Sequence, residues 1–169
     1  MILFHSIDDF CSWLKVTPFS VALQTIAWIV PAVQTVHILT ISAVISSALM
    51  ITLRAFGLSA RDQPMGVVVR RFLPVIAWSL PILLVTGLLM ITAEPARSLE
   101  NPAFFLKMAL LLVAIAVGAF WRFTVRKTEA FWESSGPRRW TAKVLTVVFL
   151  SLWVAIIFAG RWIAYVQPS

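Results

Sequence analysis

The chain has 169 residues, of which 60% are hydrophobic and only 12% are charged. A soluble domain normally carries about 25% charged residues, so this composition excludes an ordinary soluble domain and indicates an integral membrane protein. The net charge of +7 requires no nucleic-acid partner, because most basic residues gather in the loops between long apolar runs, where they set membrane orientation.

The first predicted element is an amphipathic helix over residues 5–16. Ile7, Phe10, Cys11 and Leu14 follow the spacing i, i+3, i+4 and i+7, which places their side chains on one helix face. A short helix of this kind lies in the interface rather than across the bilayer. We therefore expect residues 5–16 to lie on the membrane surface.

The first long apolar run extends from Phe19 to Leu53. As one helix it would measure about 52 Å at roughly 1.5 Å per residue, which exceeds a hydrocarbon core of about 30 Å. Pro31 lacks a backbone donor, so we expect the run to break there. The prediction is an interfacial or re-entrant piece over residues 19–30, followed by a span over residues 32–53.

Three further apolar runs, each bounded by charge or proline, predict spans over residues 72–93, 103–124 and 143–165. Together the four spans predict an all-α membrane bundle that forms a single domain over residues 1–169. Small residues four apart, such as Ala114 and Gly118, are typical of membrane helices that approach one another closely.

The basic residues predict the orientation of this bundle. Ten of the 14 Lys and Arg residues lie in two loops or their flanks, one between the first and second spans and one between the third and fourth: Arg54, Arg61, Arg70, Arg71, Arg122, Arg126, Lys127, Arg138, Arg139 and Lys143. The positive-inside rule places these loops in the cytoplasm. Both termini are therefore expected to be extracytoplasmic.

His37 is the only histidine inside a long apolar run, and an ionisable group at membrane depth marks a candidate functional site. It lies one turn below Gln34, roughly 8 Å beneath the outer boundary of its span. The expected topology brings further polar residues to the same leaflet: Glu94, Lys107, Arg161 and Tyr165.

Two interpretations of these residues remain open. They form a cluster that binds a ligand, or they have separate structural roles. In the second case the cations reach the head groups, Glu94 pairs with one of them, and His37 bonds to Gln34 or to a carbonyl. Catalysis by this chain alone is not expected, because two histidines, seven acids and one tyrosine leave few groups for an active site.

Three stretches of the chain identify a resemblance: His37 through Leu53-Arg54 to Gly57-Leu58, Asn101-Pro102-Ala103-Phe104 with Lys107, and Gly160 to Tyr165. They resemble an uncharacterised family of small four-helix bacterial inner-membrane proteins, which is loosely similar to the copper-resistance D group. The resemblance covers nearly the whole chain and implies a bacterial inner-membrane location, without implying a reaction. It also implies a histidine in the first span, matched by His37, and a second at the cytoplasmic end of the third span.

This chain departs from that pattern, because Arg122 stands at the second histidine position and Thr52 replaces an aspartate. A haem b held by two imidazoles needs a second histidine, and arginine has no lone pair to offer. Haem would therefore require His37 alone, His37 from two protomers, or His5. Copper has acceptable ligands in His37, His5 and Cys11.

Three functions are therefore considered. The first is a non-catalytic accessory subunit without a cofactor, which docks on lipid and on another membrane or periplasmic protein. The second is a redox or metal-handling protein that uses His37 to hold haem b or copper. The third is a small-molecule or ion carrier in which His37 responds to protons.

Overall fold

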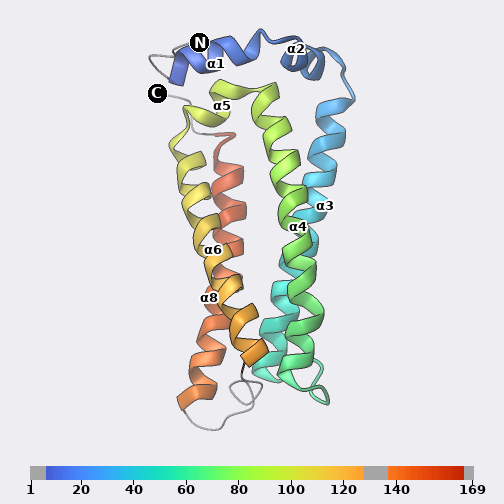
Figure 1. Ribbon diagram of the computed structural model, residues 1–169, viewed down its shortest axis with the longest axis vertical. Coiled ribbons are helices and arrows are strands. Elements are labelled where there is room, and N and C mark those ends of the chain that lie inside the picture. The colour runs from blue at the N-terminus through green and yellow to red at the C-terminus, as the bar shows by residue number, and fades with distance from the viewer. Residues whose placement is uncertain (1–6, 128–136, 166–169) are drawn as a thin grey trace.

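The computed structural model describes residues 7–127 and 137–165, and it describes the side chains of these residues outside 124–139. Within these ranges all regular elements are helical, which confirms the all-α fold. Four helices are long and apolar enough to cross a membrane, as predicted (Figure 1): α3 (Ile29–Phe56), α4 (Met65–Ala93), α6 (Pro102–Lys127) and α8 (Pro137–Trp162).

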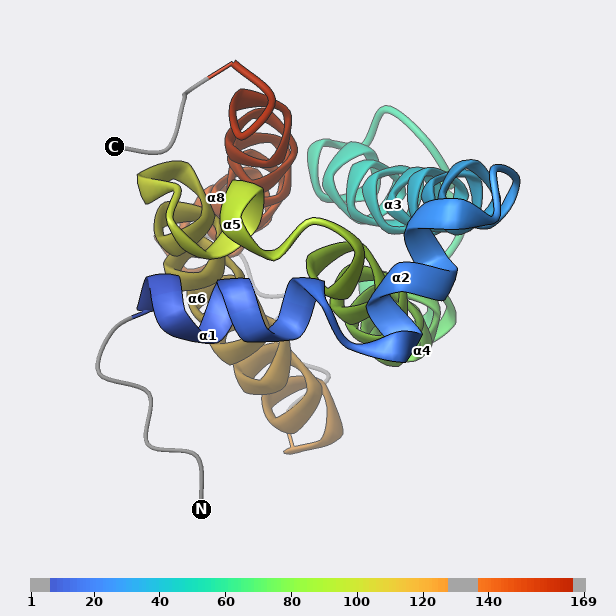
Figure 2. The ribbon, with the colours of Figure 1, turned by 90° about the horizontal axis from the view of Figure 1, so that it is seen from above.

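Three short helices lie across one end of this bundle, which we call the capped end (Figures 1 and 2): α1 (Ile7–Lys15), α2 (Pro18–Thr25) and α5 (Pro95–Leu99). Thr17 caps α2, where its Oγ1 accepts a hydrogen bond from the Ser20 amide at 3.3 Å. Ser20 is completely buried and donates its hydroxyl to the carbonyl of Thr92 at 2.7 Å. This bond ties α2 to the end of α4.

The first apolar run breaks before Pro31, not at it. α2 ends at Thr25, Ile26 adopts an extended backbone with ψ of 99°, and α3 begins at Ile29. Pro31 therefore lies in the first turn of α3, where backbone N–H groups have no helical acceptor and proline removes no bond. Because proline costs no hydrogen bond in the first turn, α3 can begin at Ile29, and the break lies between Thr25 and Ile29 instead of at Pro31.

The four long helices follow the order α4, α3, α8, α6 around the bundle. α3 packs along both α4 and α8, and α6 packs chiefly on α8 (Figure 2). α4 and α6 contact each other only lightly. Gly118 shows how closely α6 approaches α8, because a Cβ built on it would lie 3.7 Å from the Phe149 ring.

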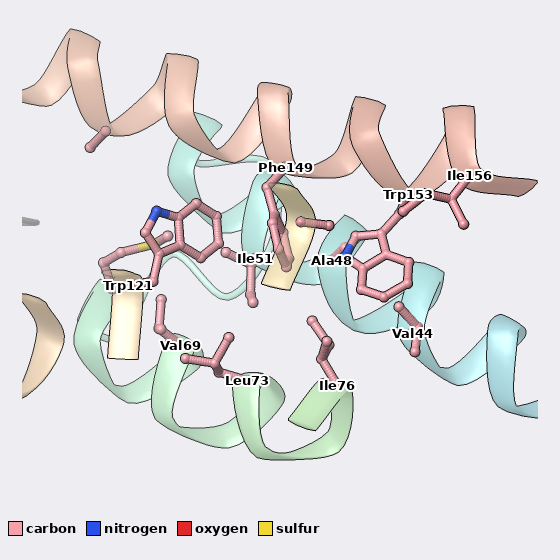
Figure 3. Packing of buried hydrophobic residues seen from close by; sticks show 13 residues of the cluster. Val44, Ala48, Ile51, Val69, Leu73, Ile76, Trp121, Phe149, Trp153 and Ile156 are labelled. Atoms are coloured by element: carbon pink, nitrogen blue, oxygen red, sulfur yellow. The ribbon is translucent and has the colours of Figure 1, made fainter. Parts of the chain in front are cut away.

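The apolar core fills the middle of the bundle and extends away from the capped end. Phe149 lies between two buried tryptophans, with ring centroids 4.7 Å from Trp121 and 6.2 Å from Trp153 (Figure 3). Aliphatic residues of α3 and α4, including Ile51 and Val69, pack against these rings. The aromatic residues are thus divided between this core and the exposed surface.

Thr52 and Arg122, the two residues that depart from the family pattern, lie in different environments. Thr52 is buried and donates its hydroxyl to the Ala48 carbonyl at 2.9 Å, with the Thr146 carbonyl of α8 at 3.2 Å. It therefore contributes a polar contact between α3 and α8. Arg122 is exposed on α6.

Candidate functional site

His37 faces α4 and is held there by one hydrogen bond. Its Nδ1 lies 2.7 Å from Thr86 Oγ1. A threonine has one hydroxyl hydrogen, and Thr86 donates it to the Ile82 carbonyl at 2.7 Å. Thr86 Oγ1 is therefore the acceptor for His37, so Nδ1 carries the imidazole proton and Nε2 keeps its lone pair.

The imidazole also lies against the neighbouring Gly87 of α4. A Cβ built on Gly87 would lie 4.0 Å from His37 Cε1, which is the carbon between the two ring nitrogens. The ring edge therefore lies close to the backbone of α4. The bond to Thr86 sets the tautomer and orients the ring toward α4.

Lys107 enters the same region from α6. Its side chain lies across Gly160 of α8, where a built Cβ would stand 3.6 Å from both Cε and Nζ. The Lys107 side chain is half-buried. Each polar side chain is thus held between two long helices: His37 of α3 lies against Thr86 and Gly87 of α4, and Lys107 of α6 lies against Gly160 of α8.

Among the described side chains, those of residues 7–123 and 140–165, Lys107 has no hydrogen-bond or ion-pair partner. The acids nearest in the chain have other neighbours. Glu94 forms an exposed ion pair with Arg97 at 2.7 Å. Glu100 lies beside Cys11, where burial of the thiol and then the Glu100 carboxylate raise the pKa of Cys11. The ammonium is therefore not neutralised by these groups.

The other predicted site residues do not join this pair. Gln34 is exposed, and Thr86 occupies the bonding position expected for it. Arg161 bonds to Tyr165 Oη at 3.2 Å and lies over that ring, and both side chains are exposed. His5 lies outside the described residues.

Sequence reasoning missed the groups that position His37 and Lys107. Thr86 lies 49 residues from His37, and only the packing of α3 on α4 brings them together. Gly87 and Gly160 are small residues without a helical repeat that would have marked them. The sequence gives the depth of a polar side chain in the membrane, but not the direction in which it points.

The two side chains have complementary hydrogen-bonding chemistry. Lys107 offers a positive donor, and His37 Nε2 offers an acceptor. Within the described residues no group of three or more His, Cys, Asp and Glu side chains is arranged to hold a metal ion. The pair suits a ligand that has both an acceptor and a donor.

A family model described as a family of unknown function (DUF6644) matches residues 12–166. This match confirms the expected uncharacterised family, whereas the similarity to the copper-resistance D group stays a prediction. No curated protein matches the chain. No solved structure matches it either.

Proposed function

The chain belongs to the DUF6644 family of unknown function, and we propose that it is a non-catalytic accessory protein that holds a small ligand between His37 and Lys107. One observation carries this proposal. An imidazole with a free Nε2 lone pair and an ammonium without a hydrogen-bond or ion-pair partner among the described side chains are both partly buried in the helix bundle. Such groups are costly inside a membrane unless something binds them.

A binding role fits the surroundings of His37 better than catalysis. A general base acts on a nearby nucleophile, but the hydroxyl hydrogen of Thr86 is already donated to Ile82. Lys107 is the other ionisable group near the imidazole. The pair can therefore bind and orient a molecule, while no activated nucleophile lies beside it in the described part of the chain.

The proposed location is the bacterial inner membrane, with both termini outside the cytoplasm. The loop that joins α3 to α4 lies at the end opposite the cap and is flanked by Arg54, Arg61, Arg70 and Arg71, as the positive-inside rule requires of a cytoplasmic loop (Figure 1). On this orientation α1 is the amphipathic helix on the outer surface. The ligand site then lies in the outer leaflet.

Trp78 supports the docking of a partner subunit within the membrane. It lies near the middle of α4, and 77% of its surface is exposed. Tryptophans that face lipid prefer the head-group region, where the indole N–H finds a partner, rather than the bilayer centre. A neighbouring subunit that covers Trp78 would supply such contacts.

A second candidate is a redox or metal-handling function at His37, with haem b or copper as ligand. The tautomer favours it, because a histidine that ligates through Nε2 donates its Nδ1 proton to an oxygen, as His37 does to Thr86. The described donors oppose it, because within the described residues no group of three or more His, Cys, Asp and Glu side chains is arranged to hold a metal ion. The accessory binding role is therefore preferred.

Native mass spectrometry of the whole protein released from mild detergent tests the proposed function. We expect the wild-type protein to retain a small bound molecule, and His37→Ala and Lys107→Met to lose it. Lys143→Met is the matched control, since Lys143 lies over the Phe56 ring near the opposite end of the bundle. If the wild-type protein and the Lys107→Met variant show the same additional mass from bound molecules, the proposal is wrong.

A visible spectrum with and without dithionite, together with metal analysis, separates the second candidate. A Soret band or a stoichiometric copper content that disappears in His37→Ala would replace the accessory role with a redox role. A colourless and metal-free protein that still carries a bound molecule is the expected result.

A further inference from the structure

We infer that the subunit that covers Trp78 is a second copy of this chain, packed against α4 about a two-fold axis along the membrane normal. The inference rests on the proposed function, in which Trp78 docks a partner, and it names that partner. It is carried by a hydrogen-bond donor and an acceptor that neighbouring residues present on the lipid-facing side of α4.

The donor is the indole N–H of Trp78. This residue lies near the middle of α4 with 77% of its surface exposed, and its indole has no hydrogen-bond partner among the described residues. When α4 is centred on a hydrocarbon core of about 30 Å, roughly 15 Å separates Trp78 from either head-group region. An indole ring does not span that distance, so lipid leaves its donor unsatisfied.

The acceptor is the main-chain carbonyl of Ala77. Pro81 follows four residues later in α4 and has no N–H, so this carbonyl lacks its helical donor. The nearby Ser79 hydroxyl does not replace that donor, because it bonds to the Val75 carbonyl at 2.8 Å. Ala77 and Pro81 are both exposed, so the missing bond lies on the lipid-facing side of the helix.

A second copy supplies the partner for both groups at once. Two copies inserted in the same orientation are related by an axis along the membrane normal, so residues at equal depth meet. The axis brings the donor of each copy to the acceptor of the other, which gives two equivalent bonds. Trp78 and Ala77 are one residue apart, about 1.5 Å along the helix, so the depths already match. A different protein would need both a donor and an acceptor at this depth.

The surface around these groups suits the packing of two long helices. Four exposed residues of α4 follow the spacing 3-4-3: Trp78, Pro81, Val85 and Leu88. This spacing keeps one seam of a helix against its neighbour in a left-handed pair. Ala77 beside the seam is small, which allows the two backbones to approach closely. α4 packs chiefly on α3 and only lightly on α6, so this seam stays free for a second copy.

Dimerisation of the full-length protein in lipid tests the inference. The probe is resonance energy transfer between copies labelled at the C-terminus, in phosphatidylcholine liposomes over a range of protein-to-lipid ratios. Trp78→Phe keeps an aromatic ring and removes the N–H, so we expect it to raise the dissociation constant of the dimer roughly tenfold. Tenfold corresponds to about 1.4 kcal/mol, close to the sum of two average interhelical hydrogen bonds in membranes. Trp162→Phe, at an exposed tryptophan of α8, is the matched control and should leave the constant unchanged.

Pro81→Ala tests the acceptor separately. Alanine restores an N–H to the Ala77 carbonyl within the helix, so this variant should weaken the dimer about as much as Trp78→Phe does. The double variant should weaken it no further, because each change removes the same two bonds. Energy transfer at the level of random proximity in the wild-type protein would overturn the second copy. A wild-type dissociation constant in Trp78→Phe or in Pro81→Ala would overturn the bonds.

Failure of this inference is distinguishable from failure of the proposed function. A photoreactive benzophenone side chain in place of Val85 should cross-link two copies of the chain in native membranes. If it joins a different protein and never a second copy, the docking of a partner at Trp78 stands and the second copy is wrong. If it joins no protein, both are wrong, while the ligand at Lys107 is decided by native mass spectrometry of Lys107→Met.

Discussion

The hydrogen bond between His37 and Thr86 should couple α3 to α4 energetically. The perturbations are His37→Ala, Thr86→Val and the double variant. Thr86→Val leaves the Nδ1–H of His37 without its acceptor, whereas His37→Ala leaves the Thr86 hydroxyl bonded to Ile82. Interhelical hydrogen bonds in membranes contribute about 0.6 kcal/mol on average and at most about 1.7 kcal/mol. The short bond of 2.7 Å between groups that are half-buried and buried predicts a coupling free energy of about 1 kcal/mol.

Unfolding from mixed micelles by titration with a denaturing detergent, followed by circular dichroism, measures this coupling. Thr35→Val is the matched control, because the Thr35 hydroxyl bonds to the Pro31 carbonyl on the exposed side of α3. Its effect should add to that of His37→Ala within about 0.3 kcal/mol. A His37 and Thr86 pair that is equally additive would refute the bond and the tautomer derived from it.

Three further predictions concern the charge, the core and the cap. Lys107→Met should raise the free energy of unfolding of the ligand-free protein by about 1 to 2 kcal/mol, because it removes an ammonium from the bundle. A lower free energy of unfolding in this variant would mean that the lysine has a partner. Phe149→Ala should lower that free energy by about 1 to 3 kcal/mol, since lipid replaces water and mainly packing is lost, while Phe158→Ala, at a lipid-facing site 64% exposed, should change it little. Cys11 should react slowly with a membrane-impermeant maleimide added outside spheroplasts, and the reaction should become faster as the pH rises. Glu100→Gln should speed the reaction, because loss of the carboxylate lowers the pKa of the thiol. Labelling that occurs only after lysis would place α1 in the cytoplasm.

The number of long helices could be predicted because bilayer thickness fixes the length of an apolar run. The positions at which the helices break were harder to predict. Pro31 suggested a break at its own position, but a proline in the first turn of a helix lacks only an N–H that has no helical acceptor. The helix therefore begins at Ile29, before the proline.

The candidate site was predictable in depth but not in direction. Lys107 and His37 were expected near one level, and the structure directs both toward neighbouring helices, Lys107 toward Gly160 of α8 and His37 toward Thr86 of α4. Arg161 was expected at that level too, but it turns outward to Tyr165. The direction of a side chain depends on how each helix is rotated about its own axis against its neighbours. The contacts of His37 with Thr86 and of Lys107 with Gly160 show that rotation, and they exist only in the packed structure.

The central claim is that Nε2 of His37 faces a bound ligand. Nitrogen-15 NMR of the histidine-labelled protein measures the protonation of both ring nitrogens directly, before and after delipidation, with His37→Ala to assign the signals. The account predicts a protonated Nδ1 in both states and an Nε2 signal that moves when the ligand is removed and returns when it is restored. A protonated Nε2 with a bare Nδ1, or an Nε2 signal that is the same in both states, would contradict it.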